Sequence, residues 1–121
     1  MRKIIDMKEV HIEQNKLMGS IQMDSPSTIK PKGQMLVDSD QFALVYIIEY
    51  MDEYVYLSFG EGCWPALNNG MQAGLPVYVK HSGKEIELID FMEELAYLID
   101  NIKDNANYGD EMGNKVEQVF L

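Results

Sequence analysis

The sequence predicts an α+β domain: an antiparallel sheet of about six strands, built from three hairpins, with one long amphipathic helix on one face plus a short helix and a C-terminal helix. Three pairs of β-type segments are each joined by a short turn, and the helical periodicity comes late in the chain. The chain has 121 residues, of which 46% are hydrophobic. That length and composition suit one folded domain, residues 1–121, with a core of its own.

The first expected hairpin lies at the N-terminus. Segment 3–13 has an imperfect strand pattern, and segment 17–23 alternates cleanly between apolar and other residues. Gln14-Asn15-Lys16 between them is typical of a turn. Residues 24–33 are rich in Ser, Pro and Gly, which predicts a loop. We expect this loop to be an excursion within one domain, because the 23 residues before it are too few for an independent core.

The second expected hairpin is the most apolar. Residues 42–48 form a continuous apolar run rich in β-formers, which is typical of a central strand buried on both faces. Residues 51–53 supply a turn, and residues 54–59 return with aromatic and β-branched side chains suited to cross-strand pairing.

A short helix and the third hairpin follow. Apolar residues at helical spacing, with a proline near the start, predict a short helix over residues 64–71. Residues 76–79 then read as a strand, Ser82-Gly83 as a two-residue turn, and residues 85–88 as the strand that pairs back.

The clearest helical pattern comes next. Its apolar stripe, at spacings of four and three, is Leu88, Met92, Leu95, Ile99 and Ile102. Such spacing predicts an amphipathic helix of about four turns laid on a sheet. Asp90 and Glu93 have the spacing of a capping box, and residues 105–109 end the helix. A last helix is expected over about residues 110–119.

The charge excludes several classes of partner. The formal net charge is −10, which repels phosphate backbones and anionic lipids, so we expect neither nucleic-acid nor membrane binding. The longest apolar run is residues 42–48. It is far too short for a membrane-spanning helix, which needs about 20 residues. The single cysteine, Cys63, and the absence of a signal-like N-terminus predict a cytoplasmic protein with reduced thiols. Residues 85–121 are strongly acidic, which fits either a solvated helical face or a surface for a basic partner.

Two stretches carry a resemblance to a known family. One is Gly-Gln-Met-Leu-Val-Asp-Ser-Asp at residues 33–40, and the other is residues 94–103, followed by Asn-Tyr-Gly at residues 107–109 and by Glu111. In these stretches the chain resembles the YjbL-like family, small cytosolic proteins of Gram-positive bacteria whose function is uncharacterised. The resemblance runs from about residue 33 to the end. It implies no activity, cofactor or catalytic residue for this chain.

Asp38 and Asp40 are the best candidates for chemistry. They flank Ser39 just before the buried strand, and in an extended backbone both carboxylates point to one side. Two such carboxylates can hold Mg²⁺ through water or divide acid and base roles. Ordinary turn chemistry at a strand entry explains the same residues, and the pattern favours it. Trp64 and Tyr108 complete the set of weak ligand-binding candidates, as polar groups beside apolar segments.

No catalytic residues, metal site or cofactor are predicted. Cys63 would need a histidine nearby to act as a nucleophile, and spacing cannot show whether His11 or His81 is close; a core role is favoured. The glycines of residues 60–74 lack the spacing of a phosphate loop.

Two functions remain open. The favoured one is a non-enzymatic binding or regulatory protein that meets a protein partner through its acidic helix or its Tyr-rich second hairpin. The alternative is a small enzyme, or a domain that binds a metal or a nucleotide ligand, with its site near Asp38 and Asp40. The sequence leaves the oligomeric state open.

Overall fold

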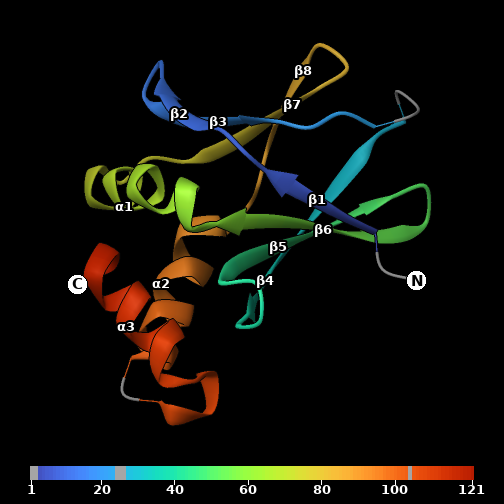
Figure 1. Ribbon diagram of the computed structural model, residues 1–121. Coiled ribbons are helices and arrows are strands. Elements are labelled where there is room, and N and C mark those ends of the chain that lie inside the picture. Colours follow the sequence, from blue (N-terminus) through green and yellow to red (C-terminus); the bar gives the residue numbers. More distant parts are fainter. Residues whose placement is uncertain (1–2, 24–26, 104) are drawn as a thin grey trace.

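The computed structural model describes residues 3–23, 27–103 and 105–121 (Figure 1). In this part of the chain, the strands form two four-stranded sheets. In spatial order, the first sheet comprises β1 (Lys3–Met7), β6 (Glu53–Gly60), β5 (Ala43–Tyr50) and β4 (Ile29–Asp38). The second comprises β2 (Val10–Glu13), β3 (Lys16–Ser20), β7 (Val77–His81) and β8 (Lys84–Glu87).

The helical elements are η1 (Glu61–Cys63), α1 (Trp64–Ala73), α2 (Phe91–Ile102), η2 (Ala106–Tyr108) and α3 (Asp110–Phe120). Figure 1 shows the three α-helices gathered on one side of the molecule, with the turns of the β5–β6 and β7–β8 hairpins toward the other. The α+β class and the three expected helices are therefore confirmed. Among the described residues, no helix has both the length and the apolar character needed to cross a membrane.

The single antiparallel sheet of about six strands is wrong. Both sheets are mixed, because β1 pairs in parallel with β6 and β3 pairs in parallel with β7. The first expected hairpin exists only as β2–β3, with Gln14 and Asn15 at its turn. Residues Lys8 and Glu9 interrupt the expected first strand, so β1 joins the other sheet. Parallel pairs join segments far apart in the chain, which turn chemistry cannot indicate.

Strand β4 corrects the loop expected over residues 24–33. From Ile29 onward the chain is extended and pairs antiparallel with β5, while residues 24–26 lie outside the described residues. The register shifts between Pro31 and Met35, and Gly33 has a φ of +67°. Proline and left-handed glycine are residues that a bulge accepts and a regular strand does not. The composition that predicted a loop therefore marks a β-bulge.

The second and third hairpins are confirmed as β5–β6 and β7–β8. Both turns have two residues with positive φ, Met51-Asp52 and Ser82-Gly83, as a right-twisted hairpin favours. The capping box at the start of α2 is wrong. Asp90 lies in the left-handed region with a φ of 59°, and its side chain makes no capping hydrogen bond. In that conformation its carboxylate does not bond the backbone N–H groups of the first turn.

The core lies between the two sheets and the helices. The apolar face of α2 packs against the core. Phe91 of this helix stacks on Tyr46 of β5 with ring centroids 5.5 Å apart. Phe91 also meets the ring of Phe59 of β6 edge-on at 5.2 Å. These contacts place α2 against one face of the first sheet, called here its inner face.

The hydroxyl of Tyr46 joins the bulge of β4 to the start of α2. It donates a hydrogen bond to the carbonyl oxygen of Ile89 at 2.7 Å and accepts one from the backbone N–H of Gly33 at 3.1 Å. Burial raises the pKa of Tyr46 to about 12, since a phenolate would lose its hydration there. The phenol is therefore neutral, and able to donate, throughout the physiological range.

Replacing Tyr46 by phenylalanine should lower the free energy of unfolding by about 2 kcal/mol at pH 7, because two backbone groups lose their partner. The difference should shrink as the pH rises above about 10, where the unfolded tyrosine ionises. The folded form keeps its proton up to about pH 12, so the wild type loses this stability between those two values. Urea unfolding of the wild type and the variant at pH 7, 9 and 11 measures the difference in the free energy of unfolding.

The matched control for this prediction is Tyr54→Phe, because Tyr54 is exposed on the same pair of strands. That variant should differ little from the wild type at any of the three pH values. A gap between wild type and Tyr46→Phe that stays constant from pH 7 to pH 11 would contradict the assigned role of the hydroxyl.

Candidate functional site

The outer face of the first sheet, away from the helices, forms a groove of about 800 Å³, called here the outer groove. It is lined by Ile4, Asp6, Met7, Leu36, Val37, Asp38, Ser39, Asp40, Gln41, Ala43, Val45, Tyr56, Ser58 and Gly60. All four strands of the sheet contribute, together with the turn between β4 and β5.

Strand register explains why the sheet is hollowed at this place. Residues that pair across the strands form two adjacent rows, Asp6–Ser58–Val45–Leu36 and Gly60–Ala43–Asp38. The two central strands carry the small residues Ser58, Gly60 and Ala43, while the edge strands carry larger side chains. Directly paired residues share a face of the sheet, so small residues at the centre and larger ones at the edges make a trough.

The outer groove combines apolar and polar side chains, and several of its apolar side chains are open to solvent. Val45 and Ala43 are buried, yet they do not belong to the main core cluster. Ile4 is 54% exposed, Leu36 41% and Tyr54, beside the groove, 56%. Exposed apolar side chains that share one face of a sheet mark a binding surface more often than scattered ones do.

Three carboxylates line the outer groove: Asp6 on β1, Asp38 at the end of β4 and Asp40 in the following turn. Within residues 3–23, 27–103 and 105–121, none of the three has an ion-pair partner. Asp38 accepts a hydrogen bond from the backbone N–H of Gln41 at 3.2 Å, which is the turn chemistry that the sequence favoured. This hydrogen bond fixes the orientation of the Asp38 side chain.

The outer face of the second sheet is different. Lys16 forms an ion pair with Glu85 and lies over the ring of Tyr78, and Lys80 lies 3.4 Å from Glu13. The hydrogen bond from Lys16 to Glu85 raises the pKa of the lysine, in keeping with a stable pair. Glu13 and Glu85 on that face are therefore paired with neighbouring lysines, whereas in the described residues the carboxylates of the outer groove have no such partner.

The structure brings together only part of the predicted site. Asp38 and Asp40 both line the outer groove, but Trp64 and Tyr108 do not. Trp64 is fully buried, and its indole N–H donates to the carbonyl oxygen of Phe59 at 3.0 Å. Tyr108 lies in η2 and packs against the core from the helical side. The structure therefore does not bring the four residues together in the outer groove, because Trp64 faces the core and Tyr108 belongs to the connection before α3.

Asp6 is the site residue that the sequence analysis missed. It lies beside Ser58 only because β1 pairs in parallel with β6. The available signal was the alternation along residues 3–7, where Ile5 and Met7 pack toward the core and Asp6 therefore faces outward.

Cys63 and His81 do not meet in the fold. The thiol of Cys63 is buried, donates to the carbonyl oxygen of Met7 at 2.9 Å, and has a pKa raised by burial. The Nε2 atom of His81 donates to the carbonyl oxygen of Ser27 at 2.9 Å. Both groups have structural partners of their own. In the described part of the chain, no three His, Cys, Asp or Glu side chains are grouped so as to hold a metal ion.

Comparison with known proteins shows which family the chain belongs to. Residues 5–120 match a family model described as a family of unknown function, UPF0738. The chain is 42% identical to a UPF0738 protein of Bacillus licheniformis and 44% identical to one of Bacillus pumilus, in both cases over the whole of both chains. It is 52% identical to UPF0738 protein YjbL of Bacillus subtilis over 76% of this chain and 75% of that one. The comparison with solved structures found no match. These matches confirm the resemblance seen in the sequence, and the chain belongs to the UPF0738 family, whose function is unknown.

Proposed function

We propose that this protein is a cytoplasmic, non-enzymatic binding protein that holds a segment of a protein partner in the outer groove. The observation that carries the proposal is the combination found there: a trough of about 800 Å³ that has apolar side chains along it and three carboxylates without ion-pair partners among the described residues. A volume of this size is typical of ligand-binding clefts.

The chemistry of the outer groove favours a protein segment over a nucleotide. Asp6, Asp38 and Asp40 would repel the phosphates of a nucleotide, and the net charge of −10 adds to that repulsion. The apolar residues along the same trough match aliphatic side chains instead. Small central side chains leave room for a chain to lie across the strands.

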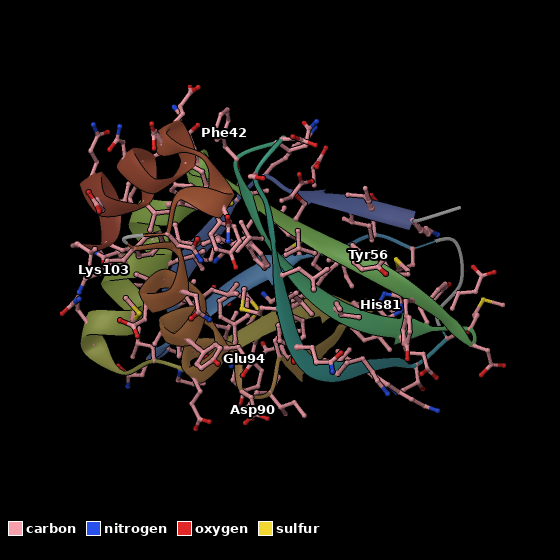
Figure 2. All side chains as sticks on the ribbon, turned by 90° about the horizontal axis from the view of Figure 1, so that it is seen from below. Phe42, Tyr56, His81, Asp90, Glu94 and Lys103 are labelled. Carbon is pink, nitrogen blue, oxygen red and sulfur yellow. The ribbon has the colours of Figure 1, made fainter. Side chains whose placement is uncertain are left out.

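The acidic helix expected from the sequence is a weaker candidate surface than the outer groove. A second hollow at the start of α2, between Glu87 and Glu93, measures only about 340 Å³. Figure 2 shows Asp90 and Glu94 on the side of the molecule opposite Phe42, which belongs to the turn beside the outer groove. The two surfaces are thus far enough apart to be tested separately.

Site-specific photo-crosslinking in the producing cells tests the proposal. A photoreactive phenylalanine analogue replaces Leu36 in the outer groove and, in a matched variant, Lys80 on the outer face of the second sheet. We expect discrete protein adducts from position 36 that are absent from position 80. Adding Val45→Glu, which places a charge on the floor of the groove, should remove them. No adduct at position 36, or the same adducts at both positions, would refute the proposal.

A further inference from the structure

We infer that the segment held in the outer groove is an extended peptide with two basic side chains, Lys or Arg, four residues apart and an aliphatic residue midway between them. The inference rests on the proposed function and specifies its partner. It follows from the charge, the spacing and the rigidity of the outer groove.

The charge of the outer groove calls for cations. A partner that covers the apolar trough also removes water from Asp6, Asp38 and Asp40. A carboxylate that loses water without gaining an opposite charge costs free energy, so a stable complex must supply cations at these positions. In the described residues, this chain supplies none of its own there, although the second sheet pairs Glu13 and Glu85 with lysines.

The spacing of the outer groove selects an extended segment. Asp6 lies on β1 and Asp38 on β4, the two edge strands of the sheet. They are three inter-strand spacings apart across the sheet and two residues apart along the strands, which together make roughly 16 Å. In an extended peptide, residues i and i+4 lie about 14 Å apart and on the same face, with residue i+2 between them. A peptide crossing the strands would thus set one basic side chain at each edge and its middle side chain over Val45 and Ser58.

The turn that carries Asp40 is anchored. Lys115 of α3 lies over the ring of Phe42, 5.1 Å from its centroid, and forms an ion pair with Glu61 at 3.3 Å. Figure 2 shows Phe42 at the turn next to this helix. With Asp38 held by the N–H of Gln41, the acidic end of the groove is formed before a partner arrives. A preformed site loses less conformational entropy on binding.

Two synthetic peptides of identical composition test the inference by fluorescence anisotropy with the full-length protein. The first, Ser-Arg-Ser-Leu-Ser-Arg-Ser, has its arginines four apart, and the second, Ser-Arg-Ser-Arg-Ser-Leu-Ser, has them two apart. We expect the first to bind about tenfold more tightly than the second. The double variant Asp6→Asn/Asp38→Asn should bind the first peptide about tenfold or more weakly than the wild type does, because both opposite charges are lost.

The matched control is Asp52→Asn/Asp100→Asn, which removes the same charge from exposed positions outside the groove. It should change the affinity by less than about twofold. The side-chain oxygen of Asn at position 38 can still accept a hydrogen bond from the backbone N–H of Gln41, so the turn keeps its structure in the test variant.

Three results would overturn the inference. The first is that the two peptides bind with equal affinity. The second is that the Asp6→Asn/Asp38→Asn variant binds the first peptide as tightly as the Asp52→Asn/Asp100→Asn control does. The third is that spermidine displaces the first peptide and binds as tightly as that peptide. In that last case the groove takes a small polyamine. Each of these results leaves the proposed function intact if the photoreactive analogue at position 36 still gives protein adducts. Loss of those adducts refutes the proposed function itself.

Discussion

Replacing Trp64 by alanine should lower the free energy of unfolding by about 3–5 kcal/mol, the largest effect expected of any single substitution discussed here. Trp64 is fully buried at the start of α1, and its ring lies 5.8 Å from that of Phe120 in α3. Its indole N–H also satisfies the carbonyl oxygen of Phe59 in β6. The substitution would therefore open a cavity where two helices and the first sheet meet, and leave a buried acceptor unpaired. Urea unfolding followed by circular dichroism measures the loss.

Two variants make this prediction decisive. Trp64→Phe keeps a ring but loses the N–H group, so it should cost about 1–3 kcal/mol and still fold. Tyr97→Ala removes an aromatic ring from α2 where the side chain is 67% exposed, and should change stability by less than about 0.5 kcal/mol. If Trp64→Ala were as mild as Tyr97→Ala, Trp64 would not be a core residue, and its place as a ligand contact would have to be reconsidered.

Replacing Gly70 by valine should cost about 3 kcal/mol. A Cβ atom at Gly70 would lie 2.3 Å from Cδ1 of Leu17, far inside van der Waals contact. Leu17 is fully buried and cannot move toward solvent, so α1 would have to shift away from β3. The absence of a side chain at position 70 is what lets the helix approach the second sheet. Thermal and urea unfolding of the variant measure the cost.

Gly113→Val is the matched control, because Gly113 is also inside a helix and a Cβ atom there would have nothing within 4 Å. Valine is a slightly better helix former than glycine, so this variant should be neutral or slightly stabilised. Equal effects of the two substitutions would mean that helix propensity, and not the contact with Leu17, decides the result at position 70.

The elements that the sequence predicts well are those fixed by neighbours in the chain. Two-residue turns such as Met51-Asp52 and Ser82-Gly83 join strands that follow one another, so the β5–β6 and β7–β8 hairpins are visible locally. The stripe of α2 repeats every three or four residues within one segment. Parallel pairing of β1 with β6 has no such local signal, and it decides that there are two sheets.

The start of strand β4 could not be predicted from the sequence for a different reason. Pro31 and Gly33 are turn residues by composition, and only the pairing of Ile29 with Tyr50 and of Met35 with Tyr46 reveals that they form a bulge. The backbone N–H of Gly33 bonds to the hydroxyl of Tyr46, a contact between strands that composition does not encode.

The candidate site follows the same division. Asp38 and Asp40 are two residues apart and could be predicted together from the chain, whereas Asp6 joins them only through the fold. The sequence predicts Trp64 as a ligand contact because it is a polar group beside apolar segments, but its N–H group donates to Phe59 inside the core. A single tryptophan next to small residues can be explained equally by burial and by ligand contact, and the pattern alone does not separate the two.

The most direct test of the outer groove as a binding site is a nuclear magnetic resonance titration of the isotope-labelled protein with the peptide Ser-Arg-Ser-Leu-Ser-Arg-Ser. We predict that the backbone amide signals that shift are those of the trough and its acidic end, with Val45, Ser58 and Gln41 among the largest. Shifts concentrated at the start of α2, around Asp90 and Glu94, or on the paired charges of the second sheet would contradict the account.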